Sequence, residues 1–370
     1  MPHLPGGLRK QPREAPCPTV PSLIPLLPFF VVLEQIPSSI LDSDTSRNPV
    51  AAELTAVPNP NSMWSFVPSV LLLAVLTSPG CAPGDRPDIL ALATAGTGGV
   101  YYVLGGSIAE LWSRDLPEYD FVAEVTGGSV ENLSLLLGGD VQVAFSMGTS
   151  AYEVFYATGS FSGREPAQVL ALSALYPNVL HLVTREGTGV ESLVDLVGRR
   201  VSVGAPGSGT EVAARTLLEG NGIGYDDFRP QRLNFNETAS ALRDGNIDAG
   251  FLSAGPPTSA IMDLATARPI RLVPLGAAEV ENTSMLDPTV SRDFFLPGTY
   301  PSQENEVETL STPNLLVVRA DMSEELVYDL LQALFAVRTE LAGVHPAARH
   351  ISAEYTLGAS PIPIHPGAVR

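Results

Sequence analysis

Lysine and cysteine are scarce in this chain, and their scarcity excludes several kinds of site. The only lysine is Lys10, and the only two cysteines are Cys17 and Cys81. All three precede the region where regular strand and helix patterns begin. The folded part therefore has neither a disulfide framework nor a thiolate metal site. No H-x-x-E or C-x-x-C spacing indicates another metal site, and we expect no metal and no cofactor.

Positive charge is also in short supply. The chain of 370 residues has 21 basic residues against 40 acidic ones, a formal net charge of −19 at pH 7. After Cys81 every basic residue is an arginine. A negative field of this size repels nucleic acid and anionic membrane surfaces, so we expect no polynucleotide partner. The chain after Cys81 is long enough for two α/β lobes with sizeable cores.

The stretch VSVGAPGSGTE, residues 201–211, is similar to a nucleotide phosphate loop that lacks its lysine. A phosphate loop reads G-x-x-x-x-G-K-[ST] between a strand and a helix. Gly204 and Gly209 have this spacing, but Thr210 occupies the lysine position. That lysine supplies the charge that pairs with the terminal phosphates. The remaining glycine turn and helix dipole can hold a small anion such as a carboxylate, so we predict a binding site and not an NTPase.

The residues before the folded part have the features of a targeting region. Residues 1–62 are proline-rich without an amphipathic period, which indicates disorder or an extension from a misplaced start codon. Segment 63–81 contains an apolar run, 66–75, that is too short to span a bilayer but suits a signal peptide. Small residues precede Cys81, as at a lipoprotein cleavage site where the cysteine is lipidated. The segment opens without a basic residue and Pro79 is unusual there, so a plain secretory signal is the alternative. We expect export, with a mature protein that begins at or near Cys81.

From Ile89 onward, strands and helices alternate with short glycine turns between them. This alternation predicts an α/β fold with parallel-rich sheets. A second unit of this pattern starts near Gly187. Open α/β sheets bind ligands at the carboxyl ends of their strands. Several glycine turns facing each other across a crevice would therefore form a ligand site.

The turn Gly96-Thr97-Gly98 follows a strand and invites a dinucleotide interpretation. The third glycine of G-x-G-x-x-G falls at Tyr101, whose ring would block the close approach of helix and strand. The turn is therefore either structural or part of a ligand site.

Ser146 follows a strand and resembles a relaxed nucleophile elbow. A serine hydrolase would also need a histidine held by a carboxylate. None of the candidate histidines lies in a recognisable motif, and a hydrolase is kept as an alternative; the candidates are His345, His350 and His365.

Two helix starts carry more polar groups than the others. At the first, Ser129 is expected to be the N-cap of a helix with Asn132 at its third position. A plain cap needs no ligand, and that interpretation stays open. At the second, Gly207–Thr210 combines glycines with two hydroxyl side chains, which goes beyond what a cap needs.

Several long motifs resemble one family. They are GTGGVYYVLGGSIAELW (96–112), TGGSVENL (126–133), LYPNVLHLV (175–183), DLVGRRVSVGAPGSGTEVAAR (195–215) and FLSAGPPTSAI (251–261). Together they resemble the TAXI family of solute receptors, which serve tripartite ATP-independent periplasmic (TRAP) transporters. The resemblance covers essentially all of 88–370. It implies a two-lobed, type II-like periplasmic binding protein fold, with 88–184 plus 305–370 in lobe 1, 185–304 in lobe 2 and a hinge between the lobes. It also implies a periplasmic receptor that is not an enzyme and that captures a small carboxylate for a TRAP permease in the membrane.

The resemblance also implies which residues contact the ligand. After the third strand, where glutamate-type members carry a Gln–Asn/Ser–Asp stretch, this chain has small groups instead, so the ligand stays open between a glutamate-like amino acid, a dicarboxylate and a keto acid. Tyr101 and Tyr176 would supply apolar walls and hydroxyls. The implied ligand-binding residues are Gly98, Gly99, Tyr101, Ser129, Asn132, Ser146, Thr149, Tyr176, Ser208, Gly209, Thr210, Pro257 and Thr258.

The implied ligand residues come mainly from four turns, which contain no arginine: those at 96–99, 126–129, 207–210 and 253–258. We therefore expect backbone N–H groups, hydroxyls and helix N-termini to hold the ligand carboxylate, and hinge closure to shield it from water. A sensory binding protein that signals to a membrane kinase would use the same site, and the sequence does not separate it from a transport receptor.

Overall fold

The computed structural model describes residues 87–370, which lie within one compact unit of the chain, Pro79–Arg370. The predictions for residues 1–62 and for the signal segment 63–81, lipidation of Cys81 included, lie outside the described residues. Among the helices of residues 87–370, none is long and apolar enough to cross a membrane.

The described strands form one ten-stranded mixed sheet in the order β2-β1-β3-β10-β4-β7-β5-β6, with β8 paired to β4 and β9 to β10. Strand β1 pairs in parallel with β2 and β3, and β5 pairs in parallel with β6 and β7. The two longest strands, β4 and β10, pair antiparallel. The strands are β1 (Asp88–Ala93), β2 (Tyr119–Glu124), β3 (Val143–Met147), β4 (Val169–Arg185), β5 (Arg200–Ser202), β6 (Arg229–Gln231), β7 (Ala249–Ala254), β8 (Ile270–Leu272), β9 (Ser291–Phe295) and β10 (Val307–Arg319).

Helices cover both faces of this sheet, so the predicted α/β class is confirmed. Two units repeat the same order, β1-α1-β2-α2-β3 and β5-α4-β6-α5-β7, and in each the first strand lies between the other two. The helices are α1 (Val100–Asp115), α2 (Ser129–Gly138), α3 (Gly148–Tyr156), α4 (Gly209–Gly220), α5 (Phe235–Asp244), α6 (Ser259–Ala267), α7 (Ala277–Leu286), α8 (Glu324–Ala336), α9 (Arg338–Val344) and α10 (Ala353–Ala359), with short 3-10 turns at Gly159–Phe161, Leu193–Leu196, Pro346–His350 and Pro366–Ala368.

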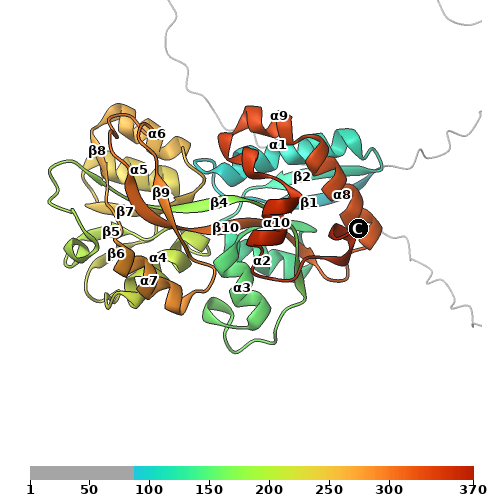
Figure 1. Ribbon diagram of the computed structural model, residues 1–370, viewed down its shortest axis with the longest axis horizontal. Helices are drawn as coiled ribbons and strands as arrows, with labels where there is room; N and C mark the ends of the chain where they lie inside the picture. The colour runs from blue at the N-terminus through green and yellow to red at the C-terminus, as the bar shows by residue number, and fades with distance from the viewer. Residues whose placement is uncertain (1–86) are drawn as a thin grey trace, which may run out of the picture. The chain divides into compact units, whose positions relative to one another are not determined.

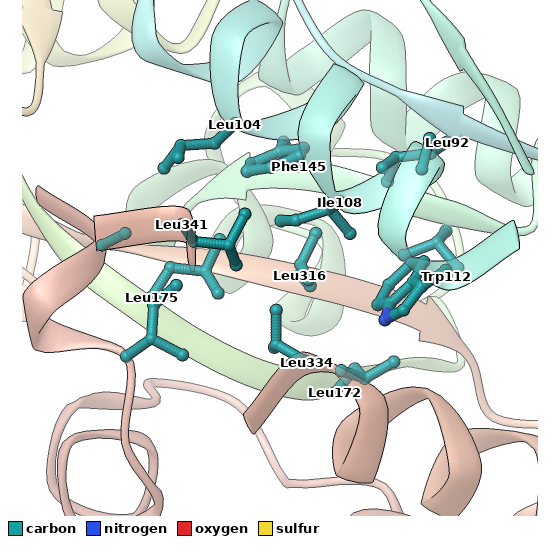
Figure 2. Packing of buried hydrophobic residues seen from close by; sticks show 14 of the residues in the cluster. Leu92, Leu104, Ile108, Trp112, Phe145, Leu172, Leu175, Leu316, Leu334 and Leu341 are labelled. Carbon is teal, nitrogen blue, oxygen red and sulfur yellow. The ribbon is translucent and has the colours of Figure 1, made fainter. Parts of the chain in front are cut away.

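Each repeat belongs to one half of the described unit, and each half has its own core. In the first half, α1, α8 and α9 cover one face of the sheet, and α2 and α3 cover the other. In the second half, α4 and α7 cover one face, and α5 and α6 cover the other. Figure 1 shows these two groups of helices around opposite ends of β4 and β10. Figure 2 shows Trp112 and Ile108 of α1 packed with Leu316 of β10 and Leu334 of α8 in the largest core of the first half.

Strands β4 and β10 pass from one half to the other. The sequence predicts two strands here, separated by Pro177, but the structure has one continuous strand. Pro177 lies opposite Pro313 of β10, and neither proline has an N–H to offer the other strand. The hydrogen bonds between β4 and β10 are therefore lost only at this pair of prolines, and both strands continue on either side of it. This crossing brings Tyr176 and Asn178 to the junction of the two halves.

Candidate functional site

A cavity of about 470 Å³ lies where the carboxyl ends of strands from the two halves meet. The turns after β1 and β2 line it from the first half, and the turns after β5 and β6 line it from the second. This is the position where open α/β sheets bind ligands. Eight of the predicted site residues line the cavity: Gly98, Gly99, Tyr101, Ser129, Tyr176, Ser208, Gly209 and Thr210.

The start of α4 presents free hydrogen-bond donors to this cavity. Ser208 is the N-cap, and its Oγ accepts a hydrogen bond from the Glu211 N–H at 3.2 Å. Among the described residues, no group accepts a hydrogen bond from the N–H of Gly209 or Thr210. The Thr210 hydroxyl accepts from the Ser253 N–H at 3.3 Å, so its own proton stays available. Together with the helix dipole, these groups form a site suited to an anion.

The start of α1 faces the same cavity from the first half. Its N-cap is Gly99, and no side chain caps the helix. Tyr101, in the first turn, lines the cavity with its ring and donates its hydroxyl proton to Asn314 Oδ1. Burial raises the pKa of Tyr101, so the phenol stays neutral. The helices that follow the central strand of each repeat thus direct their positive ends to one space.

The start of α2 is built differently, and the prediction that Ser129 caps this helix is wrong. The N-cap is Gly128, at φ 118°, and it makes no side-chain capping bond. The Ser129 Oγ instead accepts a hydrogen bond from the Met147 N–H at 3.0 Å. The N–H groups of Val130 and Glu131 both donate to Gly207 O of the opposite half, each at 3.1 Å. The Val130 and Glu131 N–H groups are therefore occupied by a contact across the cavity.

Two buried side chains from β4 line the cavity, and each has an unpaired polar atom. Tyr176 and Asn178 are 0% and 1% exposed. Neither Tyr176 Oη nor Asn178 Oδ1 has a hydrogen-bond partner, while Asn178 Nδ2 donates to Ser253 Oγ at 3.1 Å. A buried polar atom left unpaired costs about 1–3 kcal/mol. A bound solute with polar groups would remove that cost.

Five predicted site residues do not line the cavity. Asn132 is buried behind it, and its Nδ2 donates to Thr94 O at 2.7 Å and to Phe145 O at 2.8 Å. The Thr258 Oγ1 donates to Gly98 O at 3.0 Å, so it contacts the turn and not the space. The five residues are Asn132, Ser146, Thr149, Pro257 and Thr258.

Ser146 and Thr149 lie in polar contacts inside the protein. The Thr149 hydroxyl donates to Asp287 Oδ2 at 2.6 Å. Ser146 is fully buried in β3, and its Oγ donates to Met147 O at 3.0 Å. Within residues 87–370, no histidine is hydrogen-bonded to Ser146; His345 Nε2, for example, lies 3.0 Å from Pro257 O. This geometry gives the hydrolase alternative no support.

The cavity also has polar lining residues that the sequence reasoning missed. The sequence pattern predicts a strand over residues 231–235, with Arg232 inside it, but β6 ends at Gln231 and α5 begins at Phe235. Arg232 therefore lies in a turn at the carboxyl end of a strand, the position that the other turns had suggested for ligand contacts. The missed polar residues are Thr126, Asn178, Arg232, Asn234, Glu237 and Ser253.

No group of three or more histidine, cysteine or acidic side chains in residues 87–370 could hold a metal ion. Charge in the cavity lining is confined to two side chains, Arg232 and Glu237. The lining is otherwise glycine, hydroxyl, amide and apolar groups. The described residues suit a small organic solute held by hydrogen bonds and helix ends.

The comparisons place the chain in a family. Residues 92–370 match the NMT1-like family, and the chain belongs to this family. The TAXI assignment within it stays a prediction.

Solved structures resemble the chain at low identity. One is the periplasmic aliphatic sulphonate binding protein SsuA from Escherichia coli, at 15% identity and a TM-score of 0.44, covering 74% of this chain and 80% of that one. Another is the alkanesulfonate-binding protein SsuA from Xanthomonas axonopodis pv. citri bound to MOPS, at 14% identity and a TM-score of 0.45, covering 75% and 86%. A third is the ligand binding component of an ABC-type import system from Staphylococcus aureus with zinc bound, at 12% identity and a TM-score of 0.43, covering 71% and 79%. Likeness at this level does not identify a ligand for this chain.

Proposed function

We propose that this protein is an extracytoplasmic solute receptor that encloses a small carboxylate and presents it to a membrane transporter. One observation carries the proposal. The uncapped start of α1 and the free N–H groups at the start of α4 meet the unpaired polar atoms of Tyr176 and Asn178 in one cavity. The cavity therefore brings together hydrogen-bond donors from both halves and two residues of β4 with unpaired polar atoms. A bound ligand would supply the hydrogen-bond partners that these groups lack.

A carboxylate fits the α4 end of this cavity. The N–H groups of Gly209 and Thr210 and the Thr210 hydroxyl can each donate to a carboxylate oxygen. A hydrogen bond to a charged group contributes about 1.5–3 kcal/mol, and a helix terminus up to about 2 kcal/mol in partly buried geometry. These terms support micromolar affinity for an anion without a lysine. The ring of Tyr101 supplies an apolar wall.

Contacts across the cavity support a mechanism in which the halves close over the solute. Gly98 O of the first half accepts hydrogen bonds from Thr258 and Ser259 of the second, and Gly207 O of the second accepts from α2 of the first. Opening the cavity would break both sets. We propose that the hinge lies where β4 and β10 cross between the halves. The predicted lobes, 88–184 plus 305–370 and 185–304, stay part of this proposal.

The partner is proposed from the family resemblance of the sequence. A TRAP permease would take the solute from the closed receptor, with the receptor in the periplasm and attached through Cys81 if that residue is lipidated. A sensory receptor would use the same cavity with a membrane kinase as partner. A solute that is imported in cells carrying the neighbouring permease genes, and lost when those genes are deleted, distinguishes transport from sensing.

Thermal unfolding with candidate solutes tests the receptor function directly. A solute present at 100 times its dissociation constant should stabilise the fold by about 2.7 kcal/mol. The panel contains L-glutamate, succinate and 2-oxoglutarate, with ATP as a compound that should not bind. If no acid stabilises the protein, or if magnesium-ATP does, the proposal is wrong.

Thr210→Val then locates the site. The variant removes the free hydroxyl proton at the α4 start, so the affinity for the stabilising acid should fall about 10- to 150-fold in calorimetry. Thr216→Val is the matched control, because the Thr216 hydroxyl donates to Val212 O within the same helix and away from the cavity. Equal affinities of the two variants would place the solute elsewhere.

A further inference from the structure

Arg232 lies next to the free donors of α4. It follows β6, and the Val203 N–H of the neighbouring strand donates to Gln231 O at 2.9 Å. This bond fixes the start of the Arg232 turn beside Gly204, the first glycine of the turn that leads into α4. Arg232 lines the same cavity as Gly209 and Thr210.

The positive charge of Arg232 is not used by the protein. In the part of the chain that the structure describes, Arg232 makes no ion pair and no hydrogen bond, although it is an exposed side chain in an acidic protein. Its guanidinium lies 5.9 Å from the ring centroid of Tyr225. Arg232 therefore makes a cation–π contact with this ring, which Arg215 also contacts at 5.7 Å.

The nearby acidic groups are already paired. Glu211, in the first turn of α4, binds Arg215 at 2.6 Å and accepts a hydrogen bond from the Tyr225 hydroxyl at 3.1 Å. Glu237, the other charged residue of the cavity lining, accepts a hydrogen bond from the Asn234 N–H at 2.9 Å as part of a capping box. Neither carboxylate is hydrogen-bonded to Arg232 in the described residues. The guanidinium is therefore available to bind a negative group that enters the cavity.

We infer that Arg232 is the cationic anchor of the cavity and binds an acidic group of the solute beside the α4 helix start. The inference rests on the proposed receptor function and restricts its solutes to those with an acidic group. An acid should be selected over its uncharged amide by charge, and the affinity for the acid should fall with salt. A planar guanidinium can hold a carboxylate through two parallel hydrogen bonds, which an ammonium group cannot.

The test compares Arg232→Gln with Arg229→Gln. Arg229 is a suitable control because it is an exposed arginine of β6, three residues away, that does not line the cavity. Calorimetry uses the acid of the panel that stabilises the protein most, together with its uncharged amide, at low and high salt. For Arg232→Gln we expect a 10- to 150-fold loss of affinity for the acid, a weaker dependence on salt, and no change for the amide. Arg232→Lys should recover only part of the loss.

Two outcomes overturn the inference while the receptor function stands. One is an unchanged affinity for the acid in Arg232→Gln. The other is an equal loss in Arg229→Gln, which would show a general effect of protein charge. If no acid stabilises the wild-type protein, the receptor function itself fails and the anchor fails with it. Thermal unfolding without solute checks that both variants keep the wild-type fold, since both side chains are exposed.

Discussion

The two repeats, β1-α1-β2-α2-β3 and β5-α4-β6-α5-β7, have matching backbones and different ways of holding their glycine turns. In the first, the Thr94 N–H donates to Glu124 O at 2.9 Å, and in the second the Val203 N–H donates to Gln231 O at 2.9 Å. Each bond starts a turn that runs from the central strand of the repeat to a helix facing the cavity. The equivalent turns nevertheless depend on different groups.

The turn before α4 has a side-chain cap of its own, in addition to the contact of Gly207 O with α2 of the opposite half. Ser208 caps the helix, and Gly204 and Gly207 take φ values of 101° and 73° that favour glycine. The turn before α1 has no side-chain cap, and Gly98 O is bonded to Thr258 and Ser259 of the opposite half. Both turns therefore contact the opposite half, but only the turn before α4 also has a side-chain cap within its own half.

The largest expected effect is on stability and concerns His181, which is linked through Tyr300 to the contact between Thr258 and Gly98. His181 is fully buried, with Nδ1 3.0 Å from Val179 O and Nε2 2.8 Å from the Tyr300 hydroxyl. That hydroxyl accepts a hydrogen bond from the Thr258 N–H at 3.0 Å, next to the bond to Gly98. Burial lowers the pKa of His181 from 6.5 to about 4. The neutral ring therefore supports the first turn through the Tyr300 hydroxyl.

Acid should weaken the protein through this group. Because the folded pKa is the lower one, the stabilisation is complete above pH 6.5 and is lost as the pH falls towards 4. The loss of unfolding free energy should reach about 3 kcal/mol, at 1.36 kcal/mol per pKa unit. Urea unfolding across this pH range measures it, and His181→Gln should flatten the dependence. His350→Gln, at an exposed histidine, should leave it unchanged. The same pH dependence in His181→Gln and wild type would contradict the assignment.

The next largest expected effect is the difference in unfolding free energy between two glycine-to-alanine variants, one in each turn. A Cβ at Gly209 would lie 2.6 Å from Met147 Sδ and 2.7 Å from Ser129 Oγ, both on buried residues. A Cβ at Gly98 would meet the amide of Asn236, an exposed side chain that can move away, and lie 3.3 Å from Ala260 Cβ. Gly209→Ala should therefore cost about 1–3 kcal/mol through overpacking, although alanine is the better helix former. Gly98→Ala should cost less than about 1 kcal/mol.

Urea unfolding of the two alanine variants measures this difference. If both variants lose the same free energy, the two turns are equally constrained and the contrast drawn between them is wrong. A larger loss in Gly98→Ala would show that the first turn is the rigid one.

The local patterns predicted more of the fold than of the site. Alternating apolar and glycine-rich segments predicted both repeats, because strand and helix periods are properties of neighbouring residues. Helix α7 and strand β9 were missed. Ser129 was assigned as a cap because its local sequence suits one, but its Oγ is bonded to Met147, eighteen residues along the chain. The error at Arg232 came from a strand end placed four residues too late. Contacts between distant segments decided these cases, and sequence spacing does not contain them.

The smallest expected effect concerns the bond across the cavity itself. The Thr258 hydroxyl donates to Gly98 O, and the Ser259 hydroxyl donates to the same oxygen at 3.1 Å. Thr258→Val should therefore weaken solute binding by only about 0.5–1.5 kcal/mol, or about 2- to 10-fold, since Ser259 keeps the carbonyl paired. Removing both hydroxyls should cost more than the two single changes together, because the buried carbonyl is then left unpaired.

Calorimetry of Thr258→Val, Ser259→Ala and the double variant tests this coupling. Thr266→Val is the control on the same helix, because the Thr266 hydroxyl donates to Met262 O inside α6. The matching contact at the other turn, from α2 to Gly207 O, is made by backbone groups and survives every side-chain change. If the double variant binds the solute as tightly as wild type, then the hydroxyl contacts at Gly98 do not hold the halves closed, and closure depends on the backbone contact at Gly207.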